Sequence, residues 1–129
     1  MNTYLMVYGT LLLGEPNHPR MDGATFVREA RTEPRFTLTD LGPFPALREG
    51  GTVSVAGEVY EVTPEHLAAL DRFEGVPRLY ERTAVRLADG SFAEAYVQRM
   101  TSYRTPGVIA SGDWRAYRKE RNHARTNQG

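Results

Sequence analysis

Glu74 is the residue of this sequence whose type and spacing are best suited to acid–base chemistry. It follows Leu70 by four positions and Leu67 by seven, and in a helix these three side chains share one face. That face is expected to lie against the core, and the last turn of a helix carries partial negative charge. Burial and this dipole both favour the neutral acid, so we expect a raised pKa for Glu74. A carboxyl group of this kind suits general acid–base catalysis near pH 7.

A plainer interpretation of Glu74 stays open. The helix then ends at Phe73 and leaves Glu74 in solvent or paired with a nearby arginine. The arginines in question are Arg72, Arg78 and Arg82. Asp71 is expected to point away from Glu74 and to be solvated. Tyr80 and Arg82 alternate onto one face of the next predicted strand, so they either border the same site or are ordinary core and surface residues.

A second chemical feature is the turn that follows the first predicted strand, around which we expect the chain to be organised. Residues 4–8 alternate bulky apolar side chains without Gly, Pro or charge, which is typical of a buried strand. Gly9 then breaks the run and permits a close approach of another molecule. The amides of Gly9, Thr10 and Leu11 are positioned to converge as an anion-binding concavity. The alternative is a strand that ends in an ordinary turn.

Other catalytic chemistries find little support in the sequence. There is no cysteine, which excludes a disulfide framework, a thiolate nucleophile and Cys-ligated zinc. His18, His66 and His123 are isolated from one another, so no metal site is expected. The serines and threonines lack a recognisable nucleophile elbow or histidine partner. We therefore expect neither a metal nor an organic cofactor.

The composition predicts a single soluble domain of globular type. The chain has 129 residues, 40% hydrophobic and 25% charged, with 16 basic and 16 acidic residues. This balance gives no reason to expect a nucleic acid or an anionic membrane as partner. No apolar run approaches the ~20 residues of a membrane helix, and the N-terminus lacks a signal-peptide pattern. We expect a cytoplasmic protein, and the sequence does not determine its oligomeric state.

The order of predicted elements is several strands, a helix, more strands and a last helix. Strands are predicted at residues 4–8, 24–31, 35–41, 52–62, 79–87 and 91–99, with a loop at 15–23 and a rigid proline turn at 42–46. The helix is the best marked element, with Thr63 as N-cap, Pro64 at its first position, and Gly75 and Pro77 as stops. Residues 100–110 are expected to be irregular, followed by a short helix that carries Trp114 and Tyr117.

This order predicts an α+β fold, a small mixed β-barrel or curled sheet flanked by short helices. Gly57, in the middle of the longest predicted strand, indicates a bulge, a bend or a close backbone contact. We expect one domain over residues 1–117 and a polar, basic C-terminal tail over residues 118–129 that frays.

Several short motifs occur in one order along the chain, and together they resemble the γ-glutamylcyclotransferase-like (AIG2-like) family. They are Tyr8-Gly9-Thr10-Leu11, Phe44-Pro45-Ala46-Leu47 with Gly50, Gly57-Glu58-Val59-Tyr60, Leu70-Asp71 with Phe73-Glu74-Gly75, Tyr80-x-Arg82, and Ala95-x-Val97. Ser111-Gly112-Asp113-Trp114 resembles the end of the short bacterial members. The resemblance covers Tyr4 to about Tyr117.

The resemblance implies a cavity between the first loop and the helix that carries the glutamate. It also implies an intramolecular reaction on a small-molecule γ-glutamyl substrate. The free α-amine attacks its own γ-carbonyl, the ring closes to 5-oxoproline, and an amine or amino acid leaves. By position, Glu74 is the acid–base residue of this reaction. The substrate-binding residues are then Tyr8, Gly9, Thr10 and Leu11, to which we add Tyr80 from the strand pattern.

Other functions remain alternatives at this stage. The main one is a non-catalytic binding module of the same fold that holds a small carboxylate ligand. An amidohydrolase would use water in place of the substrate amine and release glutamate. A third possibility is an interaction protein whose basic tail contacts phosphates. The leaving group is also open: an amino acid, a lysine side chain from a transglutaminase crosslink, or the amine of a γ-glutamylated metabolite or antibiotic precursor.

Overall fold

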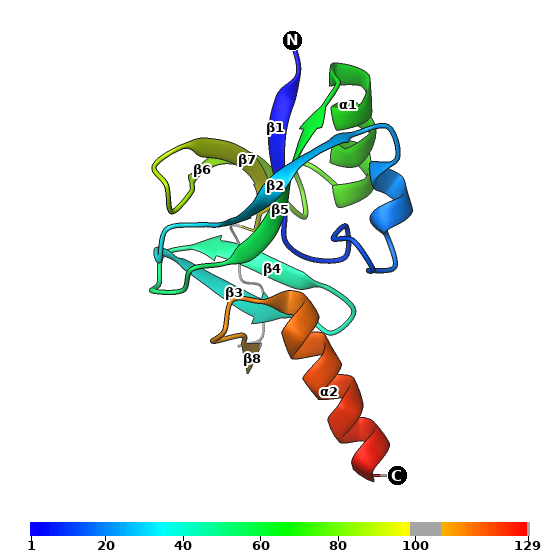
Figure 1. Cartoon of the computed structure of the whole chain (residues 1–129), viewed down its shortest axis with the longest axis vertical. Coiled ribbons are helices and arrows are strands. Elements are labelled where there is room, and N and C mark those ends of the chain that lie inside the picture. The colour runs from blue at the N-terminus through cyan, green and yellow to red at the C-terminus, as the bar shows by residue number, and fades with distance from the viewer. Residues whose placement is uncertain (99–106, 129) are drawn as a thin grey trace.

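The fold is a single mixed β-sheet with helices packed beside it (Figure 1), seen in a computed structural model that describes residues 1–98 and 107–128. Its strands are β1 (Thr3–Val7), β2 (Thr25–Arg31), β3 (Phe36–Asp40), β4 (Pro45–Glu49), β5 (Ala56–Val62), β6 (Glu81–Arg86), β7 (Phe92–Val97) and β8 (Gly107–Val108). The strand order is β2-β5-β1-β7-β4-β3-β8, and β6 pairs with β7 off this path. The α+β class is confirmed, with a curled, open sheet in place of a closed barrel.

β1 lies in the middle of the sheet (Figure 1) and ends in a run of three buried side chains. It pairs antiparallel with β5 and parallel with β7, so both of its backbone edges are occupied. Leu5, Met6 and Val7 are each at most 3% exposed, which means that both faces of the strand are covered. The predicted first strand is therefore confirmed, and the residue after it, Tyr8, enters the site from the centre of the fold.

Gly57 makes a close backbone contact, which is one of the three features that its position in the strand indicated. A Cβ at this residue would lie 2.3 Å from the carbonyl oxygen of Val7 and 2.6 Å from Cε of Met6. No side chain fits in that space, because real Cβ contacts are never so short. Glycine thus allows β5 to lie directly against β1.

β4 was not predicted, because its first residues have the composition of a turn. Pro45 opens this strand and pairs with Asp40 at the end of β3. Proline is tolerated at the first position of a strand, where its missing N–H costs little. The predicted turn at 42–46 is thus a shorter loop followed at once by a strand. The loop predicted at 15–23 likewise contains a short 3-10 helix, η1 (His18–Met21).

The helix α1 (Pro64–Glu74) has the boundaries that its capping residues predicted. The Thr63 hydroxyl accepts a hydrogen bond from the His66 amide at 3.2 Å, and Gly75 takes the left-handed conformation (φ 71°) after the last turn. Leu67 and Leu70 are buried. Glu74 is the last residue of the helix, so it stays on the face that the helical spacing assigned to it.

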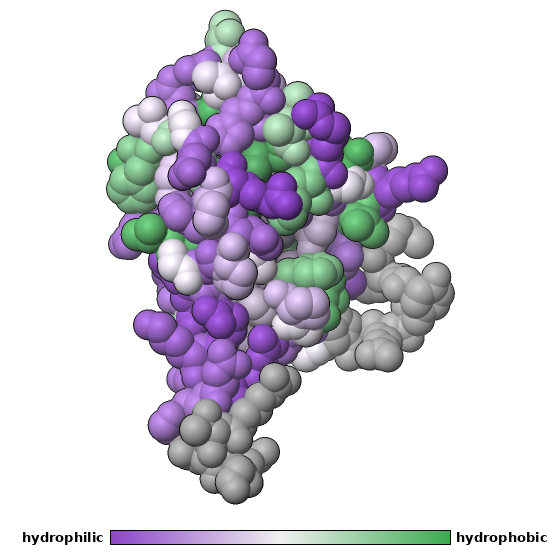
Figure 2. Space-filling view, turned by 90° about the vertical axis from the view of Figure 1, so that its right-hand side faces the viewer, coloured by the Kyte–Doolittle hydropathy of each residue, from purple (hydrophilic) through white to green (hydrophobic). Residues whose placement is uncertain are grey.

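The last helix, α2 (Trp114–Gln128), runs through the segment that was expected to fray. The described side chains of α2 that face the viewer are hydrophilic, as the purple region in the lower part of Figure 2 shows, and the sequence offers no apolar stripe beyond Trp114 and Tyr117. The helix is held instead by ion pairs: Arg115 with Glu58, Arg118 with Glu15 and Arg121 with Asp40. The arginines are three residues apart and so lie along one side of the helix. Residues 100–110 were expected to be irregular. Their described part, 107–110, begins with the short strand β8, and residues 99–106 lie outside the described residues.

Glu15 is the buried partner in the shortest of these three ion pairs. Its carboxylate accepts hydrogen bonds from Nε and Nη2 of Arg118, at 2.8 and 2.6 Å, and from the Trp114 indole at 2.8 Å. The Glu15 side chain is only 3% exposed. A buried carboxylate needs such partners to offset its lost hydration. Arg118 therefore stabilises the loop after β1, because this loop carries Glu15.

We expect Arg118→Met to lower the free energy of unfolding by about 2 kcal/mol or more, because it leaves the Glu15 charge buried with a single donor. The measurement is urea denaturation at pH 7. Arg35→Met is the matched control, since Arg35 is 80% exposed and lies 3.4 Å from its partner Glu33. A loss no larger than in that control would show that the residue 118–129 segment is an uncoupled tail.

Candidate active site

A cavity of about 250 Å³ lies between the end of β1, the start of β4, the end of α1 and β7. It is lined mainly by apolar and aromatic side chains. The lining residues are Met6, Val7, Tyr8, Gly9, Thr10, Leu11, Asn17, Phe44, Pro45, Phe73, Glu74, Leu79, Tyr80 and Tyr96. All six residues that the sequence proposed for a site are therefore brought to one cavity, and their roles stay predictions.

Glu74 is the one carboxylate among the residues that line this cavity. Burial raises its pKa from the ordinary value of 4.5 to about 7, which is the direction expected from its place on the helix. Within the described part of the chain no hydrogen bond or ion pair to its side chain is found. Of the three arginines that the alternative interpretation offered, Arg72, Arg78 and Arg82, the last is engaged with Asp71 and Glu94. Glu74 is therefore neither paired with Arg82 nor fully solvated.

Asp71 does not occupy the solvated position that was expected for it. It accepts hydrogen bonds from Nε and Nη2 of Arg82, at 3.0 and 3.1 Å, and from the Tyr96 hydroxyl at 2.7 Å. The expectation was wrong because β6 and β7 cover this side of α1, which no local spacing reveals. The ion pair with Asp71 neutralises Arg82 beside the cavity. The hydrogen bond from the Tyr96 hydroxyl to Asp71 fixes the Tyr96 ring, which lines the cavity and was not indicated by the sequence.

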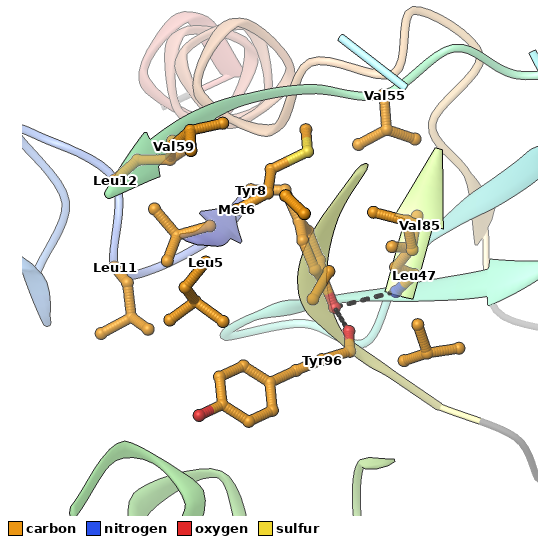
Figure 3. Packing of buried hydrophobic residues seen from close by; sticks show 14 of the residues in the cluster. Leu5, Met6, Tyr8, Leu11, Leu12, Leu47, Val55, Val59, Val85 and Tyr96 are labelled. Carbon is orange, nitrogen blue, oxygen red and sulfur yellow. Dashed lines mark hydrogen bonds between the residues drawn. The ribbon is translucent and has the colours of Figure 1, made fainter. Parts of the chain in front are cut away.

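The hydroxyls of Tyr8 and Tyr80 are bound to the protein backbone. Tyr8 donates to the Tyr96 carbonyl at 2.6 Å and accepts from the Leu47 amide at 3.1 Å (Figure 3). Tyr80 donates to the Pro45 carbonyl at 3.0 Å. Burial raises the pKa of both phenols further above their ordinary value, so both stay neutral. Their rings form the wall of the cavity, and their hydroxyls hold neighbouring strands together.

The Gly9–Leu11 turn lies tightly against β4. A Cβ at Gly9 would come within 2.7 Å of Cγ of Pro45, so glycine is required at this close approach. Asn17 fixes the turn from the other side, with its amide group bound to the Thr10 hydroxyl and its backbone N–H bound to the Thr10 carbonyl. In the described structure we find no acceptor for the amides of Gly9, Thr10 and Leu11. Asn17 is a lining residue that sequence reasoning missed, since it lay in a segment assigned only as loop.

His18 and His66 are occupied by backbone contacts. Nδ1 of His18 lies 2.9 Å from the Leu11 carbonyl and Nε2 of His66 lies 2.7 Å from the Arg20 carbonyl. Over residues 1–98 and 107–128, no group of three His, Cys, Asp or Glu side chains is arranged to hold a metal ion. None of the helices in those residues is long and apolar enough to cross a bilayer.

Fold and cavity together define a small α+β protein with one unpaired carboxylate in an apolar pocket. Comparison with known proteins identifies the family: the model described as gamma-glutamyl cyclotransferase, AIG2-like, matches residues 5–116. This chain belongs to that family, as the ordered motifs of the sequence had indicated.

Relatives and solved structures agree with this membership. A Vibrio cholerae protein provisionally named γ-glutamylcyclotransferase is 40% identical over 114 residues, which cover 88% of this chain and 96% of that protein. The γ-glutamylaminecyclotransferase of Rattus norvegicus is 40% identical over 93 residues, which cover 65% of this chain and 62% of the rat protein. A uropathogenic E. coli-specific protein of known structure has a TM-score of 0.80 at 29% identity, covering 92% of this chain and 97% of that one.

The raised pKa of Glu74 predicts a pH-dependent stability difference between the wild type and Glu74→Gln. Below about pH 4.5 the carboxyl group is neutral in both the folded and unfolded states. Between pH 4.5 and 7 the unfolded state loses this proton while the folded state keeps it, so wild-type stability falls as pH rises. Glutamine has no proton to lose. The variant should therefore gain about 1–3 kcal/mol relative to wild type from pH 4.5 to pH 8.

Urea denaturation at both pH values measures this difference, with Glu120→Gln, an exposed glutamate of α2, as the control for removing one carboxylate. A difference between Glu74→Gln and wild type that stays constant over this range would show that Glu74 is not held in an apolar environment.

Proposed function

We propose that this protein is a γ-glutamylcyclotransferase that uses Glu74 as its general acid and base. The proposal rests on the named activity of its relatives and on one observation: a carboxylate with a pKa of about 7 that faces the cavity with no described partner. A group poised at this pKa both accepts and returns a proton at neutral pH. The product is 5-oxoproline, and the co-product is the amine that was joined to the γ-carbon.

The reaction moves protons between two nitrogens of the substrate. The α-ammonium first gives a proton to the Glu74 carboxylate, and the freed amine attacks the γ-carbonyl carbon to form the five-membered ring. Glu74 then protonates the leaving nitrogen as its bond to that carbon breaks. A second proton passes from the ring nitrogen by the same route, which completes the lactam and leaves the released amine as its ammonium. The nucleophile belongs to the substrate, so no serine or cysteine is required.

The Gly9–Leu11 turn is suited to hold the α-carboxylate of the substrate. Backbone N–H groups without a protein acceptor bind an anion well, and they add no positive charge that would lower the pKa of Glu74. Fixing the carboxylate at one end of the cavity would bring the α-amine near the γ-carbon. Such positioning is worth several kcal/mol of the activation barrier.

The first test is a product assay with Glu74→Gln. The wild type incubated with γ-glutamyl amino acids, γ-glutamyl-ε-lysine and γ-glutamyl alkylamines should form 5-oxoproline, detected by mass spectrometry. Glu74→Gln should lose at least about a hundredfold in turnover, because it keeps the size of the side chain but cannot accept a proton. A folded variant with undiminished turnover would exclude Glu74 as the base. Release of glutamate would identify an amidohydrolase, and binding without turnover would identify a binding module.

The second test is the dependence of kcat/KM on pH, which reports ionisations of the free enzyme. The carboxylate form of Glu74 must be present to accept the first proton. Activity should therefore fall about tenfold per pH unit well below an apparent pKa near 7 and level off above it. An acid limb near pH 4.5 would contradict the proposal, since it would place the ionisation at the ordinary value for glutamate.

A further inference from the structure

We propose that Asn17 is a positioning residue of the cavity, whose side chain sets the Thr10 hydroxyl as a hydrogen-bond donor toward the α-carboxylate of the substrate. This inference rests on the proposed function, in which that carboxylate lies at the Gly9–Leu11 turn. It is carried by one hydrogen bond in the cavity wall and by the chemical nature of the groups around it.

The hydrogen bond between the two side chains has a direction. Nδ2 of Asn17 donates to Oγ1 of Thr10 at 3.0 Å, so the hydroxyl oxygen is the acceptor in this contact. A threonine hydroxyl carries a single hydrogen, and the contact with Asn17 does not use it. Over residues 1–98 and 107–128 we find no other acceptor for that hydrogen. Since Thr10 and Asn17 both line the cavity, the hydroxyl is left as a donor for a ligand.

The turn keeps backbone contacts that do not depend on the Asn17 side chain. The backbone N–H of Asn17 donates to the Thr10 carbonyl at 2.9 Å, and the Leu12 amide donates to the Gly9 carbonyl at 3.1 Å. Both bonds survive a change of side chain at residue 17. A substitution of Asn17 therefore changes the partner of the Thr10 hydroxyl while the backbone of the turn stays held.

A site that consists of donors favours a carboxylate over its uncharged amide. The groups left free at this end are the amides of Gly9, Thr10 and Leu11 and the Thr10 hydroxyl, all of which donate. A carboxylate accepts at both oxygens, whereas a carboxamide would bring its NH2 group against these donors. No lysine or arginine is among the described residues that line the cavity. Selection of the carboxylate thus depends on neutral donors, and Asn17 fixes the direction of one of them.

Substitution of Asn17 by aspartate reverses the direction of the contact. A carboxylate only accepts, so it would take the Thr10 hydrogen and leave a hydroxyl lone pair toward the ligand. The probes are 5-oxoproline, which retains the α-carboxylate of the substrate, and 5-oxoprolinamide, in which a carboxamide replaces it. Their dissociation constants are measured by calorimetry at pH 6, where Glu74, with a pKa of about 7, is mostly neutral. Binding of these probes requires neither turnover nor a particular leaving group.

We expect the wild type to bind 5-oxoproline at least about tenfold more tightly than 5-oxoprolinamide, and Asn17→Asp to lower this ratio about tenfold or more. Asn17→Ala removes the donor without adding charge and leaves the hydroxyl free to rotate, so it should lower the ratio by a smaller factor, about threefold. Asn122→Asp is the matched control. Asn122 is an exposed residue of α2 that does not line the cavity, and its substitution should keep the wild-type ratio.

A second background separates the direction of the hydroxyl from the added charge. Thr10→Val keeps the size of the side chain and removes the hydroxyl. If Asn17→Asp acts through that hydroxyl, its effect on the ratio should shrink to about threefold or less in Thr10→Val. Equal effects in the two backgrounds would mean that the new charge repels the carboxylate directly, and they would overturn the inference.

Two further outcomes would overturn it. One is a wild type that binds 5-oxoproline no better than 5-oxoprolinamide, and the other is an unchanged ratio in both Asn17→Asp and Asn17→Ala. Neither outcome bears on the cyclotransferase proposal, which is decided separately by formation of 5-oxoproline in the wild type and its loss in Glu74→Gln.

Discussion

The site depends on one electrostatic arrangement: a carboxylate at the end of α1 that is desolvated without a cation to pair with it. Ionisation of such a group destabilises the folded state, and the raised pKa of Glu74 reflects this cost in free energy. Arg82 is kept from Glu74 by Asp71 and Glu94, which take up its charge. If Arg82 were released toward Glu74, it would stabilise the carboxylate and lower its pKa. The ion pairs around the cavity therefore preserve the one unpaired acid inside it.

The second requirement is a rigid wall built from loop residues. The Gly9–Leu11 turn has no regular structure of its own, and it is fixed by Asn17, by its contact with Pro45, and through Glu15 by Arg118 of α2. The buried Glu15 carboxylate accepts hydrogen bonds from Arg118 and so connects the loop to a helix residue 103 positions later in the sequence. The basic segment after residue 114 thus supports the Gly9–Leu11 end of the cavity. This is a sufficient physical reason for its charge, without a nucleic-acid partner.

The sequence predicted those features that are encoded locally. The boundaries of α1 follow from Thr63, Pro64 and Gly75, and the burial of β1 follows from an uninterrupted apolar run. The place of Glu74 on the inner face follows from its spacing alone. Features that depend on distant partners were missed. β4 was missed because its proline is typical of a turn, the extension of α2 beyond Tyr117 because its contacts are ionic, and the position of Asp71 because its partners lie on β6 and β7.

The polar groups of the cavity explain why one carboxylate is enough. The hydroxyls of Tyr8, Tyr80 and Tyr96 are all used within the protein, by carbonyl groups or by Asp71. They are therefore unavailable to compete with Glu74 for protons. In the proposed reaction the attacking amine and the leaving nitrogen belong to one molecule and are both bonded to the γ-carbon in the tetrahedral intermediate, so a single acid would reach both in turn. The cavity then needs only to exclude water and to fix the far end of the substrate, for which an apolar wall and a turn of free amides suffice.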